Sequence, residues 1–234
     1  MTKVLIGIQA RSQSERLPRK GHALIGGETL MRRVLTPCQT AARYLTQSDV
    51  PCVVAVLIPE NDELKTELAK LGAEFMEGPH LDVLARYRMS LEKYEPDYVV
   101  RITGDCPLIS PYTITHMVRI AITNRYDYVT NADERFRTSF DGADCEVVSK
   151  ALLEEAHLRA DDPADREHVT TWIKRAPPSW ARMGFICGFI DQSDIKLSVD
   201  TAEDLERVRK VYESAYEKYQ KACLAFGKQN VIRQ

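Results

Sequence analysis

The sequence predicts an α/β protein whose mostly parallel, doubly wound sheet is covered by helices on both faces, in three layers. Across the first 131 residues, short apolar runs alternate with segments whose apolar residues recur at helical spacing. Hydrophobic residues make up 44% of the chain and charged residues 28%, which is the balance of an ordinary globular protein. Because the carboxyl ends of parallel strands meet at one edge of such a sheet, we expect ligands to bind there.

This first part is expected to contain strands at residues 4–9, 52–58, 74–76, 98–103 and 126–131. The run at 52–58 is almost continuously apolar and rich in β-branched residues, as in a strand covered on both faces. Helices are expected at 31–45, 60–71 and 82–93, and a further one opens at Ser110-Pro111. Pro111 suits the first turn of a helix, and Gly72 suits the end of one.

The rest of the chain is less regular. We expect a strand at 145–148, helices at 150–160 and 165–174, an extended hairpin at 180–190, a strand at 196–199 and a long helix at 201–221. We interpret residues 1–234 as a single domain. Residues 132–195 form a small α+β excursion from the sheet, suited to covering an acceptor site or forming a dimer surface.

Composition excludes several classes of function. The formal net charge is -2, so a polybasic surface for nucleic acid is not expected. No apolar run approaches the roughly 20 residues that span a bilayer, and the apolar start of the chain is too short for a secretion signal. We therefore expect a cytoplasmic protein with no membrane partner. The six cysteines form no C-x-x-C pair, which disfavours structural zinc and a disulfide framework.

The most informative segment is the polar loop at 9–20, directly after the first strand. It holds four cations and two serines: Arg11, Ser12, Ser14, Arg16, Arg19 and Lys20. A triphosphate needs fixed positive charge, hydroxyls and backbone N–H donors at such a place. A solvated basic loop is the alternative on composition alone. The loop is neither a Walker phosphate loop nor a G-x-G-x-x-G dinucleotide loop.

Two aspartates follow strands at the same predicted edge. Asp105 comes directly after the strand at 98–103, and Asp200 follows the strand at 196–199. Mg²⁺ prefers a few carboxylates together with water and phosphate oxygens, which a pair of this kind would supply. The alternatives stay open here: a turn residue for Asp105, and a helix cap for Asp200.

The pattern Arg11-x-x-Ser14-x-Arg16-Leu17-Pro18-x-Lys20 resembles the signature loop of cytidylyltransferases that activate sugar acids, the CMP-Kdo and CMP-sialic acid synthetases. The closest resemblance is to the cytidylyltransferase-like proteins of spore coat polysaccharide synthesis, the SpsF type. Matching motifs at 78–87, 101–109, 165–170 and 199–205 follow in the same order, so the resemblance covers nearly the whole chain. SpsF-type loops usually carry glycines where this chain has Gln13 and Arg19, which puts the shape of the loop in question.

The resemblance implies a nucleotide-diphospho-sugar transferase-like fold, a homodimer, and Mg²⁺-dependent transfer of CMP from CTP to a sugar acid or related acceptor in surface polysaccharide biosynthesis. Pyrophosphate would be released. The implied catalytic residues are Arg11, Arg16, Lys20 and Asp105, and the implied metal ligands are Asp105 and Asp200. The implied nucleotide-binding residues are Gln9, Ala10, Arg11, Ser12, Ser14, Arg16, Lys20, Asp82, Thr103 and Gly104. Asp82 is equally a candidate helix cap, and Arg86 is equally a surface helix residue.

Polar clusters within the excursion are interpreted as an acceptor site. They comprise Asp141, Asp144, Glu146, Arg166, Glu167 and His168. Acids, a guanidinium and an imidazole suit a hydroxyl-rich or anionic acceptor, whereas a solvated loop and a charged helix start are the alternative. Other functional hypotheses are a nucleotidyltransferase that uses another triphosphate or a phosphorylated acceptor, an inactive binding protein, and a glycosyltransferase. The last usually carries an Asp-x-Asp motif, which Asp105-Cys106-Pro107 is not.

Overall fold

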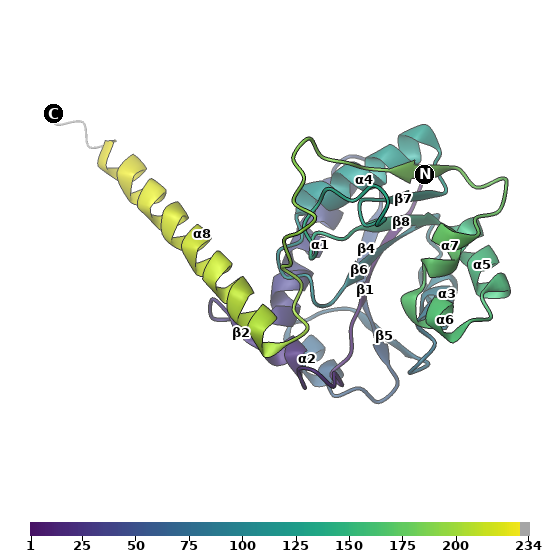
Figure 1. Cartoon of the computed structure of the whole chain (residues 1–234), viewed down its shortest axis with the longest axis horizontal. Helices are drawn as coiled ribbons and strands as arrows, with labels where there is room; N and C mark the ends of the chain where they lie inside the picture. The colour runs from purple at the N-terminus through teal and green to yellow at the C-terminus, as the bar shows by residue number, and fades with distance from the viewer. Residues whose placement is uncertain (230–234) are drawn as a thin grey trace.

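The computed structural model describes the backbone of residues 1–229 and the side chains of residues 1–215. Its centre is a seven-stranded sheet in the order β5-β4-β1-β6-β8-β7-β9 (Figure 1). The bounds are β1 Val4–Gln9, β4 Cys52–Pro59, β5 Phe75–Gly78, β6 Tyr98–Thr103, β7 Tyr128–Thr130, β8 Glu146–Ser149 and β9 Met183–Phe185. The first four strands in this order, from β5 to β6, are parallel, whereas β8 runs antiparallel to both β6 and β7. This mixed, mostly parallel sheet confirms the predicted fold class.

Helices cover both faces of the sheet. One face carries α1 Leu30–Thr46, α2 Leu64–Lys70 and α4 Pro111–Asn124, and the other carries α3 Val83–Tyr94, α5 Lys150–Arg159, α6 Pro163–His168 and α7 Thr171–Arg175. A short 3₁₀ turn, η1 Lys20–His22, and a two-stranded ribbon of β2 Leu24–Ile25 and β3 Glu28–Thr29 lead into α1. The polar loop and its cations are thereby anchored at both ends.

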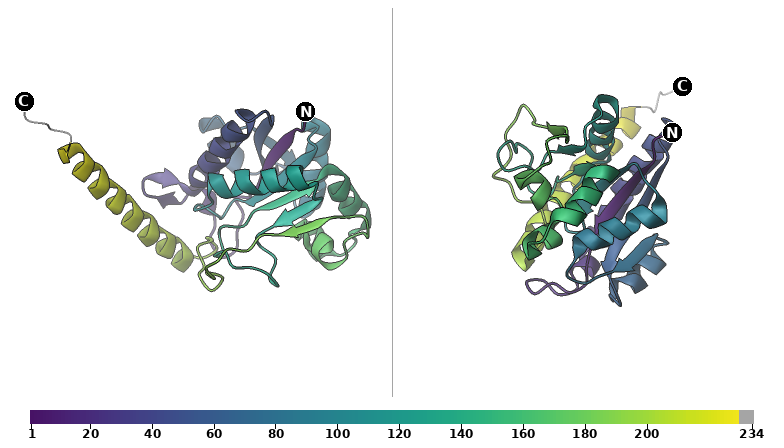
Figure 2. Two further views of the ribbon diagram at one scale, coloured as in Figure 1. Left: turned by 90° about the horizontal axis from the view of Figure 1, so that it is seen from above. Right: turned by 90° about the vertical axis from the view of Figure 1, so that its right-hand side faces the viewer.

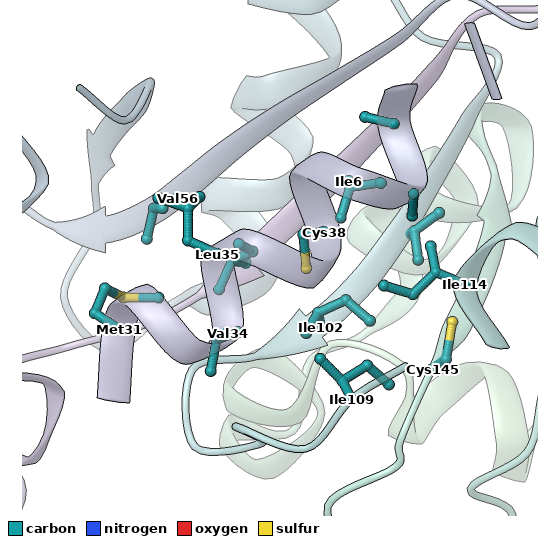
Figure 3. Packing of buried hydrophobic residues seen from close by; sticks show 14 of the residues in the cluster. Ile6, Met31, Val34, Leu35, Cys38, Val56, Ile102, Ile109, Ile114 and Cys145 are labelled. Atoms are coloured by element: carbon teal, nitrogen blue, oxygen red, sulfur yellow. The ribbon is translucent and has the colours of Figure 1, made fainter. Parts of the chain in front are cut away.

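The core lies on the two faces of the central strands because side chains alternate along a strand. Ile6 and Ile8 of β1 face α1, while Leu5 faces α3 and α5; all three are fully buried. Figure 3 shows how Val34, Leu35 and Cys38 of α1 lie against Ile6 and Ile102. Each large aliphatic side chain buried in this way contributes about 1.5–3 kcal/mol to folding. The rigid centre fixes the strand ends that carry the polar loop.

The structure differs from the expected elements at several places. The segment expected as an excursion at 132–195 is part of the main sheet, because it supplies β8 and β9. The helix expected at 60–71 begins only at Leu64, because the Asp62 carboxylate accepts the N–H of Leu64 and caps it there. The helix expected at 165–174 is split into α6 and α7 by Val169, whose φ is 62°. Residues 196–199 contribute only an isolated bridge, Asp141 with Lys196, and not a strand. Within 180–190 only β9 is a strand, and it pairs in parallel with β7 and forms no hairpin.

The last helix, α8 Ala202–Gln229, begins beside β2 and runs away from the rest of the structure, as Figures 1 and 2 both show. Its first turns are held by Leu205 and Val208, which pack into the core beside α1. Tyr212 then packs on Gly26 and lies under the guanidinium of Arg33, 4.1 Å from it. Within the described part of the chain, no helix is both long and apolar enough to cross a membrane.

Candidate active site

A cleft of about 920 Å³ opens at the carboxyl ends of β1 and β6, where the sheet topology predicts a ligand site. Its walls come from the polar loop at 9–21, the end of β6, the start of α3, the end of α6, and Asp200. Of the ten residues that the sequence assigns to the nucleotide, nine line the cleft: Gln9, Ala10, Arg11, Ser12, Ser14, Arg16, Lys20, Thr103 and Gly104. The tenth, Asp82, lies outside the lining and caps α3 by accepting the N–H of Ala85.

Asp62 holds the polar loop in place. Both of its carboxylate oxygens accept the backbone N–H of Ser12, at 3.1 and 2.9 Å, and one of them also caps α2 at Leu64. Asp62 and Ser12 are buried, so this contact is shielded from water. At the start of the loop, the N–H of Ala10 donates to the carbonyl oxygen of Leu57 at 3.2 Å. The loop is therefore tied to β4 and α2 and not only to its own strand.

The two departures from the family loop have different consequences. Arg19 adopts the left-handed conformation, with φ of 56° and ψ of 29°, which favours glycine. Its N–H nevertheless closes the loop by donating to the carbonyl oxygen of Ser12. Gln13 has no positive φ and lines the cleft. The loop thus keeps its closure without the glycine, at the cost of a strained Arg19 backbone.

The ammonium of Lys20 lies between the two predicted metal ligands. Its Nζ is 3.2 Å from Asp105 Oδ2, 3.2 Å from Asp200 Oδ1, and 2.9 Å from the carbonyl oxygen of Val199. Arg16 also reaches Asp200 Oδ1, at 3.2 Å. Although burial raises the pKa of Asp105, the charge of Lys20 and its hydrogen bond hold that pKa below the usual value. Residues 95 positions apart in the chain are therefore brought together around one positive charge.

This arrangement fits a hydrated divalent cation. The position of Lys20 Nζ shows that a cation can be held by both carboxylates at once. Among the residues whose side chains are described, no group of three or more His, Cys, Asp or Glu forms a closed metal site. Two carboxylates with open positions is the donor set that Mg²⁺ takes when substrate phosphates and water complete its shell. Asp204 fixes this corner by accepting the N–H groups of Asp200 and Thr201.

Gly104 joins the two strand ends that frame the cleft. Its N–H donates to the carbonyl oxygen of Gln9 at 2.8 Å. A Cβ at this position would lie 2.9 Å from Ala10 Cβ and 3.0 Å from Gln9 O, too close for either to remain in place. Only glycine lets β1 and β6 approach this tightly, so the Gly104-Asp105 pair places the carboxylate against the loop.

The predicted acceptor residues are not all brought together. Glu167 and His168 line the cleft, and Glu167 lies 3.6 Å from Arg11 of the loop. Arg166 instead turns to the N-cap of α3, where its Nε and Nη2 donate to Asp82 Oδ2. Asp141 and Asp144 lie outside the cleft lining, beside Arg137. Of the three consecutive motif positions at the end of α6, Arg166 therefore turns away from the cleft, whereas Glu167 and His168 line it.

Glu146 is a correction to the predicted acceptor set, because its side chain is only 2% exposed and does not line the cleft. Its oxygens accept from Arg101, Tyr128, Thr170 and Lys174. Burial raises the pKa of Glu146, but the charges of Arg101 and Lys174 outweigh it and lower the pKa to about 2. In this structure Glu146 holds the sheet to α7.

Two arginines of the cleft were not assigned from the sequence. Arg101 of β6 lines it and donates from Nε to the side-chain oxygen of Gln9 at 3.2 Å, so it orients a predicted nucleotide residue. Arg86 of α3, which we took as equally a surface position, is in fact 1% exposed. The signal in the sequence was the spacing of three residues between Val83 and Arg86, which places both on the same face of a helix.

Cys106 follows Asp105 directly but is not placed for nucleophilic chemistry. It is 2% exposed, and burial together with the charge of Asp105 raises the pKa of its thiol well above the usual value. A thiol held protonated in this way is a poor nucleophile. The chemistry of the cleft therefore rests on cations and carboxylates.

A cationic loop that faces two aspartates at the carboxyl edge of a mostly parallel sheet is the arrangement expected of the nucleotidyltransferase class of enzymes. The model of the family described as cytidylyltransferase matches residues 5–230 of this chain. The chain belongs to the cytidylyltransferase family.

Similar proteins agree with this assignment. The spore coat polysaccharide biosynthesis protein SpsF of Bacillus subtilis is 29% identical over 224 residues, which cover 93% of this chain and 90% of SpsF. A 3-deoxy-manno-octulosonate cytidylyltransferase of Neisseria meningitidis is 26% identical over 236 residues, covering 89% and 85%. The structure of a cytidylyltransferase from Leptospira borgpetersenii has a TM-score of 0.81 at 29% identity and covers 95% of both chains.

A further solved structure shares the fold at lower identity. It is a CMP:2-keto-3-deoxy-manno-octonic acid synthetase complexed with CTP, with a TM-score of 0.68 and 17% identity, covering 92% of this chain and 100% of that one. The likeness confirms the predicted fold, and the family assignment confirms the predicted enzyme class.

Proposed function

We propose that this enzyme transfers CMP from CTP to a sugar acid or related acceptor, releases pyrophosphate, and depends on Mg²⁺. The observation that carries the proposal is the position of Lys20 Nζ between Asp105 and Asp200 inside the cleft. It brings a charge that suits the triphosphate next to two carboxylates that suit its metal. SpsF by its name serves spore coat polysaccharide biosynthesis, and we propose a comparable role in making surface polysaccharide precursors.

The proposed reaction forms a bond between an acceptor oxygen and the α-phosphorus of CTP and breaks the bond to pyrophosphate. Asp105 and Asp200 would hold Mg²⁺, which when bound neutralises phosphate charge and orients the reacting groups. In this structure Arg16 and Lys20 both pair with Asp200. When metal and nucleotide bind, these two cations would leave that carboxylate and contact phosphate oxygens instead. Fixed cations at the leaving group stabilise the charge that develops in the transition state.

The acceptor is proposed to meet the end of α6. Glu167 and His168 project into the cleft from the excursion, and Arg11 lies beside Glu167. A carboxylate on the acceptor would compete with Glu167 for Arg11, which is how a guanidinium recognises such groups. The Neisseria relative is named for a sugar acid of this kind, 3-deoxy-manno-octulosonate. These contacts make an anionic sugar the acceptor class that we favour.

The proposal is tested by identifying the product. The protein is incubated with CTP and Mg²⁺ and with separate pools of sugar acids and sugar phosphates, and products are separated and weighed by mass spectrometry. A CMP-linked sugar acid formed together with pyrophosphate supports the proposal. A nucleoside diphosphate sugar formed only from the sugar-phosphate pool would replace it with the related reaction on phosphorylated acceptors. His168→Ala should raise the acceptor KM more than the CTP KM.

A further inference from the structure

A buried arginine lies at the other end of the cleft. Arg86 is 1% exposed, and among the residues whose side chains are described it makes one side-chain hydrogen bond, from Nη1 to the carbonyl oxygen of Leu57 at 3.1 Å. Its buried Nε finds no partner among those residues. Within residues 1–215, no carboxylate lies at ion-pair distance from the guanidinium, although the side chain lines the cleft. An uncompensated buried charge costs free energy, so it needs an explanation beyond packing.

The surroundings hold Arg86 rigidly in place. A Cβ on Gly78 would lie 2.8 Å from Arg86 Cγ, so the absence of a side chain at Gly78 makes room for the arginine stem. The N–H of Ala10 donates to the same Leu57 carbonyl oxygen that Arg86 contacts. The guanidinium is therefore fixed next to Ala10 of the polar loop, at the ends of β1 and β4. A donor whose position is fixed before binding suits recognition of a ligand.

The order of strands separates the two ends of the cleft. Asp105 follows β6 on one side of β1, whereas Arg86 contacts β4 on the other side. If phosphates and metal occupy the end with Asp105, the other end of a nucleotide extends toward β4. There the cleft is lined by Val83 and Ala10 next to Arg86. An apolar wall beside one fixed donor group suits a nucleobase better than a phosphate.

We propose that Arg86 reads the pyrimidine base by donating two N–H groups to adjacent acceptors on its edge. Cytosine offers such a pair in O2 and N3. Uracil offers O2 beside an N3–H donor, which a guanidinium cannot satisfy because it has no acceptor. Arg86 would thus select CTP over UTP, and this inference rests on the proposed function. Uracil is rejected strongly because its N3–H donor would be buried against the guanidinium donor, and neither N–H group would have an acceptor.

The test compares Arg86→Met with the wild type in the absence of an acceptor. Affinities for CTP and UTP with Mg²⁺ are measured by calorimetry, and thermal unfolding is measured on the free proteins. We expect Arg86→Met to bind CTP about 10- to 100-fold more weakly, to bind UTP nearly as the wild type does, and to unfold at an equal or higher temperature. The last result follows because methionine fills similar volume without a buried charge.

Two further variants make the outcome decisive. Arg88→Met changes the same helix at a partly exposed arginine that pairs with Glu92, and it should leave both affinities unchanged. Arg86→Lys keeps the charge but not the paired donors, so it should fold and still lose most of the preference for CTP. If Arg86→Met and Arg86→Lys both keep the wild-type preference for CTP over UTP, the inference about Arg86 is overturned and the proposed function is not. A wild type that binds no triphosphate overturns the proposed function and this inference with it.

Equal losses for CTP and UTP together with a lower unfolding temperature would show that Arg86 serves only the fold, and would also overturn the inference.

Discussion

The backbone N–H of Arg19 donates to the carbonyl oxygen of Ser12 at 3.0 Å, and Arg19 takes a φ of 56° to do so. This contact closes the loop that carries Arg11, Arg16 and Lys20. The closure is therefore a property of the backbone path, and a side chain at position 19 only makes that path more costly. The exposed ion pair of Arg19 with Glu63, at 3.8 Å, offsets little of the cost.

Two substitutions at position 19 isolate this cost. Arg19→Gly and Arg19→Ala both remove the guanidinium, but only glycine tolerates the left-handed conformation freely. We expect the glycine variant to have a free energy of unfolding about 1 kcal/mol higher than the alanine variant. Chemical denaturation of both proteins measures the difference. Equal stabilities would mean that the backbone at position 19 is not strained.

The anchor of the loop gives a second prediction. Asp62→Ala leaves the buried N–H of Ser12 without its acceptor and removes the cap of α2, which should cost about 1–3 kcal/mol. The loop should also lose order, so that the affinity for triphosphate falls. Glu60→Ala is the matched control, because Glu60 is exposed and does not line the cleft. If Asp62→Ala is less stable but binds triphosphate as tightly as the wild type, Asp62 supports the fold and does not support the nucleotide site.

The buried Glu146 makes stability depend on pH. Its pKa is lowered to about 2 in the folded protein from an ordinary value of 4.5. The stability that the charged form contributes is fully present above about pH 4.5 and is lost as pH falls toward 2. Glu146→Gln should therefore destabilise the protein by about 3 kcal/mol at pH 7, because Arg101 and Lys174 lose their charged partner.

Denaturant unfolding at pH 7 and pH 3 checks the prediction for Glu146, and the difference between wild type and variant should be smaller at the acidic pH. Glu92→Gln, at an exposed ion pair on α3, should change stability by less than about 0.5 kcal/mol. A difference that grows as pH falls would contradict the assigned sign. An increase in acceptor KM at unchanged stability would restore Glu146 to the acceptor site.

The predicted homodimer also has a test in the excursion. Phe189 is fully exposed and Ile190 is 75% exposed, a cluster of apolar surface that a partner would cover. Light scattering on the wild type should give about twice the 26.6 kDa of the chain. Phe189→Asp combined with Ile190→Asp should halve that mass. A monomeric wild type would remove the dimer from this account.

The elements that followed from the sequence are those whose apolar pattern is long and regular. The strand at 4–9 matches β1 residue for residue, and the helices at 31–45 and 82–93 differ from α1 and α3 by one residue at each end, because buried side chains dictate their period. The boundaries that were wrong depend on contacts between distant segments. The Asp62 carboxylate that delays α2 bonds to Ser12, fifty positions earlier, which no local pattern contains.

The sequence indicated some of the residues that line the cleft but not all of them. Residues at the ends of strands lie in the cleft, since the pairing of β1 with β6 brings Gln9 and Thr103 side by side. The excursion was harder, because consecutive residues of a helix point in different directions, so Arg166 reaches Asp82 whereas Glu167 and His168 line the cleft. Arg86 was missed as a cleft residue because an arginine in a helix is usually exposed, and its burial depends on the glycine at position 78.

The measurement that tests the central claim most directly is pyrophosphate release from CTP, UTP, ATP and GTP with Mg²⁺ and a pool of sugar acids, for the wild type and for Asp105→Asn. The account predicts release from CTP that requires an acceptor, falls when Mg²⁺ is chelated, and is lost at least 100-fold in the variant. Absence of release from all four triphosphates, or full activity in Asp105→Asn, would contradict it.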